Sequence, residues 1–372
     1  MNTLNIGKNI LDNRRKKGIT QEALANFLGV SKASVSKWET LQSYPDILLL
    51  PELSSYFNIS IDALIGYSPQ MTGAEIKKTY RQFADDFSGK PFDSVYASCQ
   101  NLIKEYYACL PFLSEMALLY INHHMLADTK EKQKSLLKEA ITLCQRVKSE
   151  TAEVKLLKEA INLEATACLM LGDAHAVLNL LGETASILQP DTEMISQAYE
   201  LLGNIPKAKE ILQISMYQHL IMLVASAPSY LMMHNDEPEK FEQILSRALA
   251  VSEIYDLENL HPNTMVQIYY AAANHYCVHN NKDTTYEMLA AYTNVCCSKF
   301  FPYSLHGDEY FNQIDTLFEE LDVCTNAPRS KTVIIDSMID GVMKNPIFEP
   351  LKNEKRFKQI LQQLKSLKGE TK

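Results

Sequence analysis

The sequence predicts an all-α protein, with a five-helix Cro/CI-type domain at the N-terminus followed by an α-solenoid body of the tetratricopeptide (TPR) type. Apolar residues recur at helical spacing along most of the 372 residues, and no alternating strand pattern is present. Breaks that contain proline, glycine or asparagine divide residues 74–372 into segments of roughly helix length. Each element is considered below in chain order.

The first helix is predicted over residues 5–17. Ile6, Ile10 and Leu11 share the spacing of one inward face. The helix ends in the basic run 14–17, where positive charge is favoured by the helix dipole.

Residues 20–39 are predicted to form two short helices joined by a tight turn. Thr20 and Ser31 have side chains that cap helix N-termini. Gly29 stands where the first of these helices must end, and glycine tolerates the left-handed backbone that such an end commonly needs. Ala25 leaves room for a steep helix crossing. This is the layout of a helix-turn-helix, whose second helix enters a DNA major groove.

The same stretch and its flanks resemble the Cro/CI-type (XRE) DNA-binding domain over about residues 5–66. The residues that carry the resemblance are Gln21, Ala25, Gly29, Val35, Trp38 and Glu39. The resemblance implies sequence-specific DNA binding. It also implies a buried pair between Arg14 and Glu39 that links the first helix to the end of the third.

Two further helices are predicted to complete this domain. The fourth follows Asp46, a good N-cap, but Pro51 removes an amide inside it, which predicts a kink or a late start. The fifth spans about 60–66. The breaker-rich stretch 68–73 then predicts a linker.

These observations predict two domains: a DNA-binding domain over residues 1–67 and, after the linker, a sensor and dimerisation domain over residues 74–372. Net charge is −9 overall, but residues 1–45 carry seven Lys/Arg and three Asp/Glu, which leaves −13 on the rest. A basic head meets DNA phosphates, whereas an acidic body is repelled by them.

Three turns in the body are predicted from spacing of the TPR type. In this pattern an aromatic or other apolar residue precedes the turn by four, and a small residue follows it by five. Tyr199, Gly203 and Ala208 keep the spacing best, and weaker versions surround Gly172 and Asn280. The intervals between turns are irregular. An irregular all-α domain is the alternative to a degenerate solenoid.

The DNA contacts are carried over from the family resemblance. The third helix would present base-reading side chains, and Gln21 and Ser34 would bind phosphate beside helix N-terminal amides. The predicted DNA-binding set is Gln21, Ser31, Lys32, Ala33, Ser34, Ser36 and Lys37. For Lys37 the alternative is a solvated surface lysine. The helix offers no Gln or Asn for a bidentate adenine contact.

No catalytic, metal or cofactor site is predicted. The sequence lacks H-E-x-x-H, a P-loop and G-x-S-x-G. His275 and His279 are four apart on one predicted helix, but no third ligand is arranged near them in sequence, so an ordinary half-buried pair is favoured. The vicinal Cys296 and Cys297 are read as buried apolar residues, with redox or soft-metal sensing as the alternative.

A cytoplasmic protein with no membrane contact is expected. The sequence has no uninterrupted run of about 18 apolar residues and no hydrophobic signal segment at its beginning. None of its eight Cys forms a C-x-x-C, which fits a chain whose thiols stay reduced.

Amide and hydroxyl side chains are predicted on the concave wall of the body. The candidate effector-binding residues are Asn162, Thr166, Gln267, Tyr270 and Asn274. Such a wall suits an extended peptide, whose backbone the amides bond at both ends. A head of the XRE type on TPR-like hairpins resembles the Rgg/PlcR group of peptide-pheromone receptors in quorum sensing. The alternative is a concave face that binds nothing.

The sequence therefore predicts a transcriptional regulator, not an enzyme. Its partners would be a double-stranded DNA operator, a second copy of the chain, because one head reads only a half-site, and a short peptide or other small effector. Two alternatives remain open. The body either docks a protein partner, as in an interaction scaffold, or is purely structural, as in a constitutive repressor.

Overall fold

A computed structural model describes residues 5–67, 70–185, 191–320 and 329–369. Throughout these ranges every regular element is a helix, which confirms the all-α prediction. The chain divides into two compact units: residues 1–76 with 100–113, and residues 77–99 with 114–372. The predicted domain boundaries stay a prediction, and linker residues 68 and 69 lie outside the described ranges.

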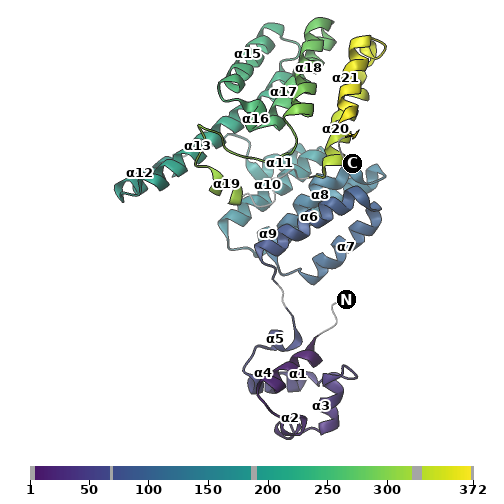
Figure 1. The fold of residues 1–372 in the computed structure, drawn as a ribbon, viewed down its shortest axis with the longest axis vertical. Helices are drawn as coiled ribbons and strands as arrows, with labels where there is room; N and C mark the ends of the chain where they lie inside the picture. The colour runs from purple at the N-terminus through teal and green to yellow at the C-terminus, as the bar shows by residue number, and fades with distance from the viewer. Residues whose placement is uncertain (1–4, 68–69, 186–190, 321–328, 370–372) are drawn as a thin grey trace. The chain divides into compact units, whose positions relative to one another are not determined.

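The first unit contains the helix-turn-helix. Its helices within the first 67 residues are α1 (Ile6–Lys16), α2 (Gln21–Phe27), α3 (Lys32–Glu39), the 3-10 helix η1 (Ile47–Leu49), α4 (Leu50–Phe57) and α5 (Ile61–Ile65). They lie together at the purple end of the ribbon in Figure 1. A core of ten buried residues holds them, including Ile10, Leu24, Val35 and Leu53, none of which has measurable exposure.

The local signals predicted for this unit are confirmed. Thr20 accepts a hydrogen bond from the Ala23 amide and caps α2. Gly29 has a φ of +67°, the left-handed backbone that ends α2 and allows the turn into α3. Pro51 lies in the first turn of α4, after η1, so the late start is what occurs.

The remaining helices follow in chain order, coloured from blue to yellow in Figure 1. They are α6 (Gly73–Gly89), α7 (Phe92–Glu105), α8 (Leu110–His123), η2 (His124–Leu126), α9 (Lys130–Glu150), α10 (Val154–Leu171), α11 (Ala174–Leu181), α12 (Asp191–Leu201), α13 (Ile205–Ala225), α14 (Ala227–Met233), α15 (Pro238–Ile254), α16 (Leu257–Leu260), α17 (Pro262–Val278), α18 (Lys282–Ser298), α19 (Asp315–Glu320), α20 (Lys331–Met343), η3 (Pro346–Leu351) and α21 (Lys355–Ser366).

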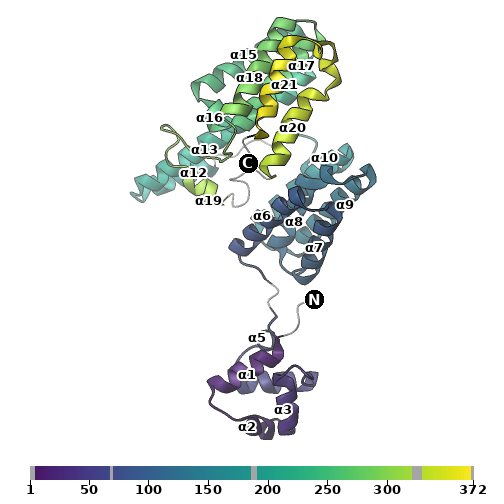
Figure 2. The same ribbon diagram turned by 45° about the vertical axis from the view of Figure 1, so that its right-hand side comes forward.

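The three predicted turns of the body are confirmed. Gly172, Gly203 and Asn280 have φ values of +79°, +74° and +59°, the left-handed conformation in which a helix commonly stops. The helices on either side of each turn contact one another, as α10 with α11, α12 with α13, and α17 with α18. The pair α17 and α18 lies side by side in both Figure 1 and Figure 2.

Two apolar clusters in the second unit extend from α17. One joins α17 to α13, α14, α15 and α16, with Phe241 and Leu231 fully buried. The other joins α17 to α18, α20, η3 and α21, with Phe348 and Phe357 fully buried. Because α17 contributes to both clusters, its side chains are covered on nearly every face.

One helical stretch of the described residues, Ile205–Met233, is long and apolar enough to cross a membrane by length and composition. Only 28% of its most apolar window is buried. Core helices of globular proteins meet the same criterion.

Candidate nucleic-acid interface

Helix α3 separates a buried face from an exposed one. Val35 and Trp38 are core residues, with 0% and 5% of their surface exposed. Lys32, Ala33 and Lys37 are exposed. Neither lysine forms an ion pair with any residue of the described chain, so both ammonium groups are free to meet an anion. The helix therefore presents two cations and a methyl group to solvent.

The first turn of α3 is fixed by its cap. Ser31 accepts a hydrogen bond from the Ser34 amide at 3.1 Å, and the two hydroxyl oxygens lie 2.8 Å apart. Ser31 is exposed, while Ser34 and Ser36 are half-buried. The cap orders the residues that precede and flank Lys32 and Ala33, since it satisfies an amide that a helix start leaves unpaired.

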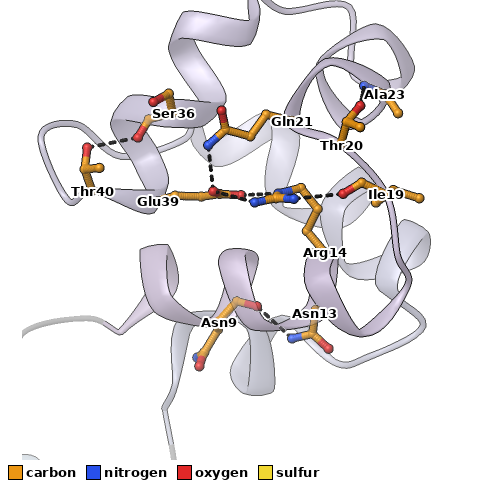
Figure 3. A network of polar contacts seen from close by, with 10 residues as sticks. All are labelled: Asn9, Asn13, Arg14, Ile19, Thr20, Gln21, Ala23, Ser36, Glu39 and Thr40. Carbon is orange, nitrogen blue, oxygen red and sulfur yellow. Dashed lines mark hydrogen bonds and ion pairs between the residues drawn. The ribbon is translucent and has the colours of Figure 1, made fainter.

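A buried ion pair holds the end of α3 against α1 (Figure 3). Arg14 donates from Nε to Glu39 Oε1 at 2.5 Å and from Nη2 to Oε2 at 3.0 Å. Its Nη1 donates to the Ile19 carbonyl at 2.8 Å. The side chains of Arg14 and Glu39 are only 12% and 4% exposed. This bidentate geometry fixes both the distance and the orientation of the two helices.

Gln21, a predicted phosphate ligand, joins the same network. Its Nε2 donates to Glu39 Oε2 at 2.8 Å. One of its two amide hydrogens is thereby used inside the domain, and one remains for an outside acceptor. Sequence reasoning missed this contact because Gln21 and Glu39 stand eighteen positions apart.

Burial and hydrogen bonding shift the pKa of Glu39 in opposite directions. Burial alone would raise the pKa of its carboxyl, but the hydrogen bonds from Arg14 and Gln21 and the nearby positive charges of Arg14 and Arg15 outweigh it. The pKa of Glu39 is therefore lowered, and the hydrogen bond to Glu39 raises the pKa of Arg14. Both groups stay ionised near neutral pH.

Asn9 also positions the domain, and nothing in the sequence pattern singled it out. Its Nδ2 donates to the carbonyls of Ala63 and Leu64, both at 3.1 Å, which ties α1 to α5. Lys17 donates to the Tyr56 carbonyl at 2.6 Å. These bonds tie α4 and α5 to α1, which the Arg14–Glu39 pair links to α3.

The candidate effector residues differ in their surroundings. Asn162, Thr166 and Gln267 are exposed, on α10 and α17. Asn274 is buried and donates to the Tyr270 carbonyl at 2.7 Å. The five amide and hydroxyl side chains of this set therefore do not share one environment.

Asn345, which sequence reasoning did not connect with these residues, joins two of them. Its Nδ2 lies 2.8 Å from Tyr270 Oη and 2.6 Å from Asn274 Oδ1. Tyr270 Oη donates to the Gly341 carbonyl at 2.8 Å. Tyr270 and Asn274 thus take part in a network that links α17 to Gly341 in α20 and to Asn345 just after it.

No metal centre is formed by the residues in the described ranges, where no group of three potential ligands occurs. His275 stacks on Phe241 with ring centroids 3.5 Å apart, and its Nδ1 lies 3.0 Å from Asn235 Oδ1. Burial lowers the pKa of His275. Cys296 is buried, as predicted, and burial raises its thiol pKa to about 12, so this thiol is unreactive. Cys297 is exposed, so the prediction of a buried residue is wrong there: consecutive residues of a helix point to different faces, and Cys296 is the one that faces the core.

The class of domain is set by this geometry. Two short capped helices meet across a left-handed glycine, the second helix exposes its polar N-terminal face, and the unit is a helix-turn-helix domain. A family model described as Helix-turn-helix matches residues 10–64.

Two curated proteins are similar to this region. The HTH-type transcriptional activator BcrR of Enterococcus faecalis is 38% identical over 73 residues, which cover 18% of this chain and 36% of that protein. An uncharacterized HTH-type transcriptional regulator of Bacillus subtilis (strain 168), the SPbeta prophage-derived YonR, is 28% identical over 100 residues, or 27% of this chain and 82% of that protein. The match thus spans little more than a third of BcrR.

One solved structure was also found by comparison of folds. It is the crystal structure of Bacillus thuringiensis PlcR in complex with the peptide PapR7 and DNA. The comparison covers 78% of this chain and 93% of that chain at 14% sequence identity, with a TM-score of 0.30. A score this low does not establish a shared fold.

Proposed function

We propose that this protein is a sequence-specific, DNA-binding transcriptional regulator. Residues 1–67 act as the DNA-binding domain, and α3 is its reading helix. The observation that carries the proposal is the division of α3, with Val35 and Trp38 in the core and unpaired Lys32 and Lys37 exposed. The similarity to two transcriptional regulators supports the same conclusion.

The individual contacts follow from side-chain chemistry. Lys32 and Lys37 donate to guanine O6 and N7, Ala33 contacts a thymine methyl, and Ser36 bonds to a base edge. Gln21 donates its second amide hydrogen to a phosphate. Ser31 and Ser34 order the first turn of α3, whose amides approach the DNA backbone.

The regulator works as a homodimer in this proposal, and its body, residues 74–372, sets the spacing of two heads. Half-sites on one face of DNA lie about 34 Å apart, so two rigidly spaced heads gain affinity that one head lacks. An effector that binds better to one spacing shifts operator affinity. The exposed Asn162, Thr166 and Gln267 are the candidate contacts for such an effector.

Fluorescence anisotropy on DNA from the protein's own promoter region tests the DNA-binding proposal. The double variant Lys32→Ala/Lys37→Ala should weaken binding at least tenfold and reduce the preference for promoter DNA over an unrelated duplex, because both lysines are assigned to base edges. The matched control is Lys130→Ala/Lys134→Ala, which removes two exposed lysines at similar spacing from α9. Equal losses in the two variants would contradict a reading role for α3.

A further inference from the structure

The second unit contains an open groove between α13–α14 and α15 that the proposed function does not use. Its volume is about 620 Å³, within the size range of small-molecule sites. Leu223 and Val224 come from α13, Ala227 from α14, and Val251 and Ile254 from α15. Leu223 and Ile254 are 65% and 76% exposed, so apolar side chains line the mouth and remain in water.

The charges of the groove are all of one sign. Lys240 and Arg247 are among its thirteen lining residues, and no Asp or Glu is. Neither cation forms an ion pair with a residue in the described part of the chain. Residues 46–372 carry 29 Lys/Arg and 42 Asp/Glu, so this part of the chain is acidic. The lining of the groove, with two cations and no acid, therefore has the opposite sign of charge.

The cations lie on the same face of α15 as the apolar wall. Lys240, Arg247, Val251 and Ile254 follow one another at intervals of seven, four and three residues. Such intervals stack side chains along one side of a helix. The side chains that α15 contributes to the groove therefore change along the helix, from Lys240 and Arg247 to the apolar Val251 and Ile254 at its end. Lys240 also borders a shallower groove that contains Glu237 and Glu239, which makes Arg247 the better anchor for an anion.

The neutral polar groups of the groove are few. Only Ser226, Tyr230 and Gln243 add hydrogen-bonding side chains to the two cations. A peptide would bring one amide and one carbonyl per residue that need partners once buried. An alkyl chain brings none. The lining is thus better matched to an aliphatic chain with one anionic end than to an extended peptide.

From this combination we infer that the groove between α13–α14 and α15 binds a medium-chain carboxylate, with the carboxylate on Arg247 and the alkyl chain along Leu223, Val251 and Ile254. Arg247 donates two parallel N–H bonds to the carboxylate, a geometry that guanidinium and carboxylate share. Lys240 adds a second positive charge. The site is independent of the DNA-reading face.

Titration calorimetry of the full chain without DNA tests this site, with decanoate as the probe. Saturable binding is expected, about fifteenfold tighter for each two carbons added from octanoate to dodecanoate, because each buried methylene contributes about fourfold. Decanol and decyltrimethylammonium, which lack the anion, should bind at least tenfold more weakly. Because no DNA is present, failure here leaves the proposed DNA binding untouched, and the reverse also holds.

Variants of Arg247 supply the decisive comparison. Arg247→Gln should weaken decanoate binding at least tenfold, whereas Arg81→Gln, which removes an exposed arginine from α6, should leave it unchanged. Arg247→Glu should reverse the preference, so that decyltrimethylammonium binds better than decanoate. Circular dichroism of each variant shows that the fold is retained.

Several results would overturn the inference. They are decanoate and decanol binding equally, no effect of Arg247→Gln, and an apolar tetrapeptide acid displacing decanoate at lower concentration. A further one is loss of self-association in Leu223→Asp by sedimentation, which would assign the groove to a second copy of the chain.

Discussion

Gln21, the first residue of α2, donates its side-chain amide to Glu39, the last residue of α3, at 2.8 Å. The same oxygen accepts from Arg14 Nη2 at 3.0 Å. One buried carboxylate thus binds a cation from α1 and an amide from α2. This single group thus adds a polar link among the three helices, whose apolar side chains already share one core.

Arg14→Met should destabilise the DNA-binding domain by about 3 kcal/mol, because it leaves the Glu39 carboxylate buried without its cation. The protein has one tryptophan, Trp38, and it lies in the core of this domain. Urea unfolding followed by Trp38 fluorescence therefore reports on the domain itself. The double variant Arg14→Met/Glu39→Met should recover much of the loss. No recovery would mean that the charge left behind is not the cause.

Gln21→Ala should cost about 1.5–3 kcal/mol in the same unfolding measurement, the ordinary range for one hydrogen bond to a charged group. If Gln21 also binds phosphate, DNA affinity should fall by more than this stability loss accounts for at temperatures where the domain stays folded. Gln21→Glu is the informative companion, because it sets a carboxylate against Glu39 and against DNA phosphate. An unchanged DNA affinity in both variants would remove Gln21 from the interface.

Acid should weaken the domain through Glu39. Its pKa is lower in the folded domain than the ordinary value of 4.5 because hydrogen bonds and nearby positive charges outweigh its burial. A depressed carboxyl pKa contributes stability that is complete above pH 4.5 and is lost as the pH falls through the folded value. Urea midpoints by Trp38 fluorescence should fall more steeply below pH 4.5 in the wild type than in Glu39→Gln. Parallel curves would contradict this role.

Two substitutions of Ser31 test its capping role and the role of its position in DNA binding separately. Ser31→Ala should cost about 1 kcal/mol, because the Ser34 amide loses its acceptor. Ser31→Asp should keep the cap and the stability but place a negative charge at the exposed start of α3. DNA binding by anisotropy should then fall at least tenfold in Ser31→Asp. Retained binding would indicate that this end of α3 lies away from phosphate.

Asn274 and Gln267 should behave differently although both are candidate effector residues. Asn274→Ala removes a buried side chain that accepts from the half-buried amide of Asn345, and it should destabilise the body by about 1–2 kcal/mol. Gln267 is exposed, and Gln267→Ala should change stability by less than about 0.5 kcal/mol. Thermal unfolding by circular dichroism measures both. A stable Asn274→Ala would free this residue for a ligand role.

Local features were predictable because their causes lie within a few residues of one another. The caps at Thr20 and Ser31 and the late start of α4 at Pro51 follow from side-chain and ring chemistry. The turns at Gly203 and Asn280 follow from the backbone preferences of those two residue types. The same short-range patterns defined the helix-turn-helix and its exposed lysines.

Contacts between distant positions were not predictable in this way. Asn9 is more than fifty positions from Ala63, and Asn345 is 71 from Asn274. An asparagine on a helix has the same local pattern whether it is solvated or bonded to another helix. The polar residues placed on a concave wall from spacing alone were therefore found in unlike surroundings, with Gln267 exposed and Asn274 buried.

The sequence by itself determined the helical content, the turns and the two helices of the helix-turn-helix, since each depends on short-range periodicity and capping. Only the tertiary structure decided that Glu39 binds both Arg14 and Gln21, and that Lys240 and Arg247 line an apolar groove whose lining residues include no Asp or Glu. These features depend on how helices pack. Packing brings together side chains whose separation along the chain carries no signal.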